Sequence, residues 1–164
     1  MLDQNKLDWL GIHATHINAH LLTQVFDEFA NQEILKNPNK KIAWSRPILI
    51  GGGWKPGWST DYVSVLMAEN TNAKTVINLS NIDAVYDKDP KKYKKAKKIK
   101  KISWPDFKKI VGGRWVPGAH LPFDPIASRL AEKSKLRVIV MNGHKLSELE
   151  KALKNEEFKG TLIG

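Results

Sequence analysis

The residues GGGWKPGWSTDY (51–62) follow the apolar run ILI and have the composition of an anion-binding loop. Glycines let a backbone approach a phosphate closely, and the free N–H groups at the start of a helix favour negative charge. Ser59 and Thr60 add hydroxyls that can cap a helix or donate to a ligand. The same residues also fit a plain turn between a strand and a helix, and their spacing matches neither the dinucleotide-binding nor the Walker pattern. The loop alone therefore allows both a phosphate site and an ordinary connection.

Apolar periodicity predicts the elements that position this loop. A long helix is expected over 6–30, because its apolar residues recur three and four positions apart and give it one apolar face. These residues are Leu7, Leu10, Ala14, Ile17, Leu21 and Val25. A buried strand is expected over 47–50, a helix over 60–72 and a second buried strand over 74–79.

The second half of the chain shows clear helix starts. Ser103, with Asp106 three residues later, predicts a capped helix that ends at the following glycine pair. Asp124 before Pro125 predicts another helix, which runs to about residue 133. A strand over 136–141, a helix over 146–154 and a last strand at GTLI complete an alternation of strands and helices. This alternation predicts an α/β fold, a three-layer α/β/α sandwich with a mainly parallel central sheet, as one domain over 1–164.

A second polar segment, NLSNIDAVYDKDP (78–90), follows the strand predicted over 74–79. Together with the glycine-rich loop, it resembles the amino acid kinase family, and most closely its archaeal-type uridylate (UMP) kinases. Members carry a loop that ends in Thr-Thr-Asp, here Ser59-Thr60-Asp61, and a Thr-Asn-Val-Asp-Gly-Val-Tyr segment, here 80–86, that leads to Asp89-Pro90. LDWLGI near the start, PFDPIASRLAE (122–132) and GTLI match further landmarks in the same order.

The resemblance implies a role for each matching residue. It implies that the acceptor UMP binds Asp8, Gly53, Trp54, Lys55, Pro56, Gly57, Trp58, Ser59 and Thr60. It implies that ATP binds Ser80, Asn81, Tyr86 and Asp89, and that Asp124 and Asp61 are catalytic. Without the resemblance, Asp8 reads as a surface residue, Tyr86 as a packing residue and Asp124 as a helix cap.

The activity implied by the resemblance is transfer of the ATP γ-phosphate to UMP, which gives UDP and ADP for pyrimidine nucleotide biosynthesis. It further implies Mg²⁺ as the cofactor that accompanies ATP, the cytoplasm as location, and a homo-oligomer, often a hexamer, with the first helix as interface. Two alternatives stay open at this point. One is a non-catalytic nucleotide- or oxyanion-binding member of the fold, resembling molybdenum storage or regulatory proteins, and the other is a kinase for another small acceptor.

Some features depart from the family pattern. The sequence has no match to the family's N-terminal strand and Gly-Gly-Ser-type loop, which bind the ATP phosphates in that family. We therefore expect the C-terminal major part of the domain, N-terminally truncated, and a chain that can be inactive alone. Ala84 replaces a glycine, and Trp54 and Trp58 are unusual in the loop, where they could stack on a base or form a subunit contact.

Composition limits the remaining partners. Eight of the lysines lie in KKYKKAKKIKK (91–101), so removing this stretch reduces the net charge from +10 to +2 and argues against a broad nucleic-acid-binding face. The absence of cysteine excludes disulfides and cysteine-ligated zinc, and no apolar run is long enough to predict a membrane span. His13, His16 and His20 share one helical face, but no carboxylate completes a zinc site there, and we predict no metal site. His120 lies near Asp124 in sequence and is the histidine we consider most suited to a functional role.

Overall fold

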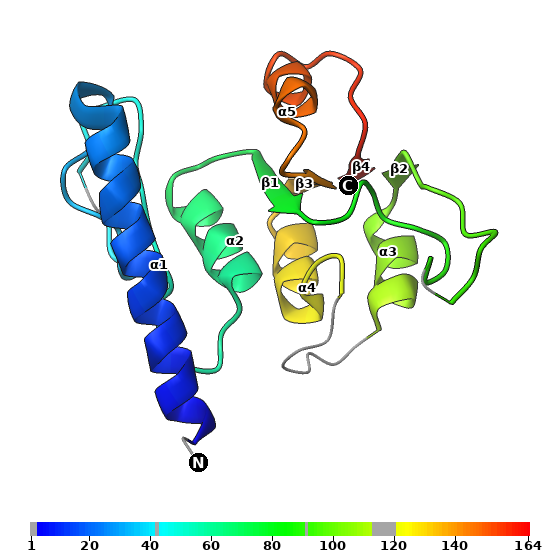
Figure 1. Ribbon diagram of the computed structural model, residues 1–164, viewed down its shortest axis with the longest axis horizontal. Coiled ribbons are helices and arrows are strands. Elements are labelled where there is room, and N and C mark those ends of the chain that lie inside the picture. Colours follow the sequence, from blue (N-terminus) through cyan, green and yellow to red (C-terminus); the bar gives the residue numbers. More distant parts are fainter. Residues whose placement is uncertain (1–2, 42, 91, 113–120) are drawn as a thin grey trace. The chain divides into compact units, whose positions relative to one another are not determined.

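The computed structural model describes residues 3–41, 43–90, 92–112 and 121–164. It divides the chain into two units, Met1–Thr71 and Asn72–Gly164 (Figure 1). The single domain expected over 1–164 stays a prediction. The segment GGRWVPGAHLP, with His120, lies largely outside the described residues.

The first unit contains α1 (Gln4–Phe26), the short 3-10 helix η1 (Asp27–Phe29) and α2 (Thr60–Asn70). Asp3 caps α1 by accepting the Lys6 backbone N–H at 2.9 Å. The strand predicted over 47–50 is wrong, because the chain there forms only isolated parallel bridges, Ala30 to Ile48 and Leu35 to Gly51. Between the two bridges this segment advances by three residues and its partner by five, so the pairing does not keep one register and forms no regular ladder.

The apolar face predicted for α1 is largely exposed. Ile17 and Val25 are 70% and 66% exposed, whereas the helix buries Ile12, Ala19 and Thr23 within its unit. Ala19 packs in a small core with Ala30, Ile34 and Ile50. The periodicity thus predicted the helix correctly, but its richest apolar face does not form the core of this unit.

The second unit is built on a four-stranded sheet in the order β1-β3-β4-β2. β1 (Thr75–Ser80) runs parallel to β3 (Arg137–Asn142), with Thr75 opposite Arg137 and Ser80 opposite Asn142. β4 (Thr161–Ile163) is antiparallel to β3, and β2 (Lys101–Ile102) is parallel to β4. Two of the three strand pairings are parallel, which confirms the predicted α/β class with a mainly parallel sheet.

Helices lie on both faces of this sheet, as Figure 1 shows: α3 (Trp104–Val111) and α4 (Pro125–Lys133) on one side, and α5 (Leu146–Leu153) on the other. Ile139 and Met141 of β3 pack with Ala152 of α5. Val138 and Val140 are also buried, and they point to the opposite face because side chains alternate along a strand. The three layers of this unit match the predicted sandwich.

Candidate functional site

The glycine-rich loop lies along α1 and is hydrogen-bonded to it at two points. The Gly53 N–H donates to the Thr15 hydroxyl at 2.7 Å, and the Gly53 carbonyl lies 2.8 Å from His16 Nε2. Further along, the Gly57 N–H donates to Asp8 Oδ2 at 2.9 Å. Seven residues separate Thr15 from Asp8, so the loop follows about 10 Å of the helix. The structure therefore brings together Asp8 and the loop, the residues that were predicted to bind the acceptor.

The three consecutive glycines are explained by this close packing. A Cβ on Gly52 would lie 2.5 Å from His16 Cδ2, and one on Gly51 would lie 2.6 Å from Met67 Cε and 2.9 Å from the Leu35 carbonyl oxygen. Gly57, farther along the same loop, instead needs glycine for its backbone angle, because its φ is +82°. The glycines thus let the loop approach α1 and α2, which the sequence alone did not distinguish from an approach to a phosphate.

The residues after the loop begin α2. The Ser59 hydroxyl accepts the Tyr62 backbone N–H at 3.1 Å and caps the helix, as the sequence predicted. Thr60 is the first helical residue, and Asp61 is half-buried in the first turn. A negative charge is favourable there because the helix dipole places partial positive charge at this end. The helix start is well formed, and its capping hydroxyl also keeps a proton that it can donate.

An aromatic stack connects the loop to α2. The Trp58 and Tyr62 rings lie 4.2 Å apart between centroids with an interplanar angle of 22°, and Trp54 lies 6.2 Å from Trp58. The Lys55 ammonium lies 4.1 Å from the centroid of the Trp54 ring, a cation–π contact. One face of Trp58 is therefore covered by Tyr62. Sequence reasoning missed Tyr62, although its spacing of four from Trp58 at a helix start was a usable signal.

Asp8 is held in its charged form. The Gly57 backbone N–H and the Gln4 side-chain amide donate hydrogen bonds to its carboxylate. These two hydrogen bonds hold the pKa of Asp8 below its usual range, and the bond from Gly57 has the larger effect. Gln4 was also missed from the sequence, and it lies one helical turn before Asp8. The outcome is a half-buried carboxylate on α1, ionised at neutral pH and directed at the loop.

In the second unit, predicted ATP-binding residues lie at the carboxyl ends of parallel strands. Ser80 ends β1, opposite Asn142 at the end of β3, and Asn81 follows Ser80 directly. Tyr86 pairs with Lys98 in an isolated antiparallel bridge. Ligands of open parallel sheets gather at these strand ends. Asp89 is exposed, and its carbonyl accepts the backbone N–H of Tyr93 at 2.9 Å, so it begins a turn in the lysine-rich segment.

Asp83 is the central polar residue of this region and was missed from the sequence. Its carboxylate accepts from Lys145 Nζ at 2.7 Å, Lys98 Nζ at 2.7 Å and Asn142 Nδ2 at 3.0 Å. These hydrogen bonds, that of Lys145 first, hold the pKa of Asp83 well below its usual range. Its partners lie 15 to 62 residues away in the sequence, so no local pattern indicated the cluster.

Asp124 is buried at the start of α4. Its Oδ1 accepts the backbone N–H groups of Ile126 and Ala127, the latter at 3.0 Å, which confirms the predicted cap. The Asn78 side chain of β1 donates to the Pro122 carbonyl at 3.1 Å and so connects the strand to the segment before α4. The catalytic role of Asp124 stays a prediction.

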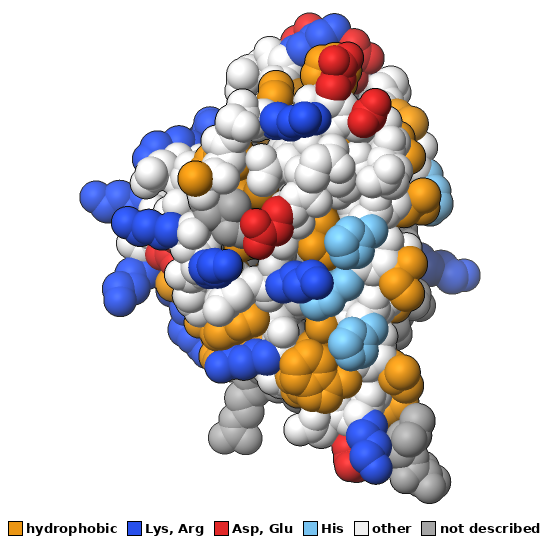
Figure 2. Space-filling view, turned by 90° about the vertical axis from the view of Figure 1, so that its left-hand side faces the viewer, with side chains coloured by type: hydrophobic (Ala, Val, Ile, Leu, Met, Phe, Trp, Pro, Cys, Tyr) orange, Lys and Arg blue, Asp and Glu red, His pale blue; other side chains and the backbone are white. Residues whose placement is uncertain are grey.

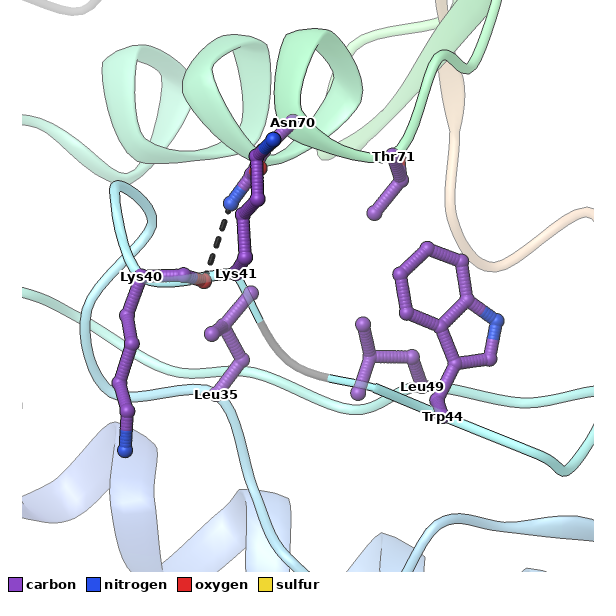
Figure 3. A pocket seen from close by; sticks show the side chains of 7 residues that line it. All are labelled: Leu35, Lys40, Lys41, Trp44, Leu49, Asn70 and Thr71. Carbon is purple, nitrogen blue, oxygen red and sulfur yellow. Dashed lines mark hydrogen bonds between the residues drawn. The ribbon is translucent and has the colours of Figure 1, made fainter.

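The histidines of α1 and the cavity of the first unit give no further site. Figure 2 shows histidine side chains beside apolar and basic ones on one face, but no three His, Asp or Glu side chains in the described part of the chain are grouped to hold a metal. In the first unit, Leu35, Lys40, Lys41, Trp44, Leu49, Asn70 and Thr71 line a cavity of about 220 Å³ (Figure 3). Asn70 donates to the Lys40 carbonyl at 3.0 Å at its edge. Ligand pockets usually measure about 300–1,000 Å³, so the cavity is small for a nucleotide. No helix among the described residues is long and apolar enough to cross a membrane.

Comparisons with known proteins found related sequences and structures. The model of the amino acid kinase family matches residues 1–142. The uridylate kinase of Methanobrevibacter smithii is 36% identical over 155 residues, which cover 93% of this chain and 69% of that relative. The uridylate kinase of Sulfolobus acidocaldarius is 34% identical over 99% of this chain and 73% of its own length. The crystal structure of the uridylate kinase from Archaeoglobus fulgidus matches with a TM-score of 0.84 at 30% identity, over 99% of this chain and 74% of that one.

Proposed function

The chain belongs to the amino acid kinase family, and from this premise we propose that it transfers the γ-phosphate of ATP to UMP, giving UDP and ADP. One observation carries the proposal: relatives named uridylate kinase are 34–36% identical over nearly the whole chain. The geometry of the acceptor loop, the carboxylate of Asp8 and the polar strand ends are consistent with it. Pyrimidine nucleotide synthesis in the cytoplasm is the proposed setting.

The acceptor side of the proposal rests on α1 and the loop. A carboxylate accepts more hydrogen bonds than the two that Asp8 receives from Gly57 and Gln4, so it can also accept from ribose hydroxyls. The N-terminus of α2, with Ser59 and Thr60, is suited to the phosphate of UMP. Fixed positioning of the two reactants is the main contribution a protein makes to phosphoryl transfer.

The donor side of the proposal uses Ser80, Asn81, Tyr86 and Asp89, with Asp124 and Asp61 as the catalytic carboxylates. Mg²⁺ binds as the complex with ATP, since Mg²⁺ commonly takes few protein ligands and several phosphate oxygens and waters. It would neutralise charge on the transferring phosphoryl group. Asp124 is buried and its Oδ1 caps α4, so it fits an organising role better than that of an open metal ligand.

A homo-oligomer is also part of the proposal. The exposed apolar side chains of α1 support it, because a long row of Leu, Ile and Val is normally covered in a stable protein. These side chains are Leu7, Leu10, Ile17, Leu21 and Val25. A hexamer is the assembly expected from the resemblance, and light scattering would measure it.

The proposed activity is tested by ADP release from Mg·ATP with a panel of acceptors: UMP, CMP, AMP and isopentenyl phosphate. ADP release that depends on UMP and exceeds the rate with each other acceptor supports the proposal. UMP binding by calorimetry without turnover would instead favour a non-catalytic nucleotide-binding protein. Turnover of a different acceptor, or the absence of any nucleotide binding, would overturn the proposal.

A further inference from the structure

The lysine-rich segment of the second unit is closed at its base by a short backbone ladder. Tyr86 pairs with Lys98, the Ile99 N–H donates to the Val85 carbonyl at 2.9 Å, and the Asp87 N–H donates to the Lys97 carbonyl at 3.1 Å. Residues 85–87 and 97–99 therefore run side by side, and the described residues 88–90 and 92–96 extend beyond them. The ladder places the Lys98 side chain beside that of Tyr86.

Lys98 lies between Asp83 and Tyr86 at this position. Its ammonium donates to Asp83 Oδ2 at 2.7 Å. The hydrogen bond to Asp83 is the largest cause of the raised pKa of Lys98. Tyr86, the partner of Lys98 in the antiparallel bridge, carries its side chain on the same face. An ammonium has three N–H donors, so Lys98 keeps donors for the neighbouring Tyr86 hydroxyl beside its bond to Asp83. Asp83, Lys98 and Tyr86 thus lie next to one another in that order.

Asp83 is also hydrogen-bonded by residues at the end of β3 and beside α5. Asn142 at the end of β3 and Lys145 beside the start of α5 both donate to its Oδ1. The carboxylate consequently joins the segment after β1, the base of the lysine-rich segment and the end of β3. It lies where parallel strands end, the place at which such sheets bind ligands.

We infer that Asp83 is a positioning residue for the nucleotide donor, acting through Lys98 to fix the Tyr86 side chain at the carboxyl end of β1. The inference rests on the proposed function, in which Tyr86 contacts ATP. A purely stabilising role is a poor explanation, because the Lys98 and Asp83 side chains are 53% and 28% exposed and ion pairs at such exposure contribute little to folding. A half-exposed pair of Asp83 and Lys98 can still orient the neighbouring Tyr86 side chain, although it adds little to stability.

The test compares Asp83→Asn with Glu157→Gln, a matched control in the same unit whose carboxylate pairs with Lys100 at the surface. Binding of Mg·ATP is titrated by calorimetry, and the ring of Tyr86 is followed by NMR of ¹³C-labelled tyrosine, its signal assigned with Tyr86→Phe. Asp83→Asn should move the Tyr86 signal and weaken ATP binding roughly tenfold, as expected for loss of a charge-assisted hydrogen bond. Glu157→Gln should change neither. Lys98→Met, which keeps the aliphatic stem, should reproduce Asp83→Asn.

The double variant Asp83→Asn with Tyr86→Phe separates positioning from general damage. If Asp83 acts through Tyr86, the double variant binds ATP as weakly as Tyr86→Phe alone, because coupled sites are not additive. Additive losses, or an unmoved Tyr86 signal in Asp83→Asn, would overturn the inference while leaving the proposed function intact. Failure of the unaltered chain to bind Mg·ATP would overturn the donor side of the proposed function and this inference with it.

Discussion

Replacing Thr15 by valine should loosen the acceptor loop from α1. The Thr15 hydroxyl accepts the Gly53 N–H at 2.7 Å and donates to the Ile12 carbonyl at 2.7 Å. Valine has nearly the same shape but no oxygen, so the buried Gly53 N–H loses its acceptor. An orphaned buried donor costs about 1–3 kcal/mol, and the lost back-bond to the helix carbonyl adds little because that carbonyl belongs to a helix interior.

Thr23→Val provides the matched control for this change. Thr23 lies on the same helix, is buried, and donates to the Ala19 carbonyl at 2.9 Å. It has no described hydrogen bond with the loop, so its replacement should change the free energy of unfolding by less than about 1 kcal/mol. The two variants therefore differ mainly in the Gly53 hydrogen bond.

Urea denaturation and hydrogen exchange measure the prediction. Thr15→Val should lower the free energy of unfolding by about 2 kcal/mol, within the range for an orphaned donor, and speed exchange of the Gly53 amide. Thr23→Val should leave that amide protected. Equal unfolding free energies for the two variants, or unchanged exchange at Gly53, would refute the reasoning that α1 holds the loop in place.

Three further changes follow from the same structure. Gly57→Ala should destabilise the loop by about 1–2 kcal/mol, because φ is +82° there; wild-type stability in thermal denaturation would contradict this. Asp124→Asn should keep the α4 cap and the melting temperature but reduce ADP release at least tenfold, and unchanged turnover would remove Asp124 from the catalytic residues. Folding lowers the pKa values of Asp8 and Asp83 from the unfolded value of 3.8. Their contribution to stability is therefore fully present at pH above this unfolded pKa and is lost as pH falls through the folded pKa. Melting temperatures of the unaltered chain and of Asp83→Asn should therefore converge in strong acid and differ only slightly at pH 5–8, because half-exposed ion pairs contribute little to folding; a difference that does not change with pH would contradict this.

Local signals in the sequence predicted the caps and helices well. Ser59, Ser103 and Asp124 each accept a backbone N–H of their own helix, and such caps depend only on neighbouring residues. Contacts between residues far apart in the sequence could not be predicted in this way. The Asp83 cluster joins side chains up to 62 residues apart, and the packing of Gly51 and Gly52 depends on Met67 and His16. The strand expected over 47–50 also failed for a long-range reason, because a strand requires a regular partner that no local pattern reveals.

UMP binding by the residues of α1 is the central claim, and calorimetric titration of UMP tests it most directly. Asp8→Asn is compared with Asp3→Asn, a carboxylate of the same region that only caps α1, where asparagine is an equally good cap. We predict that the unaltered chain and Asp3→Asn bind UMP alike and that Asp8→Asn binds it at least tenfold more weakly. Equal UMP affinity of Asp8→Asn and the unaltered chain would contradict the account.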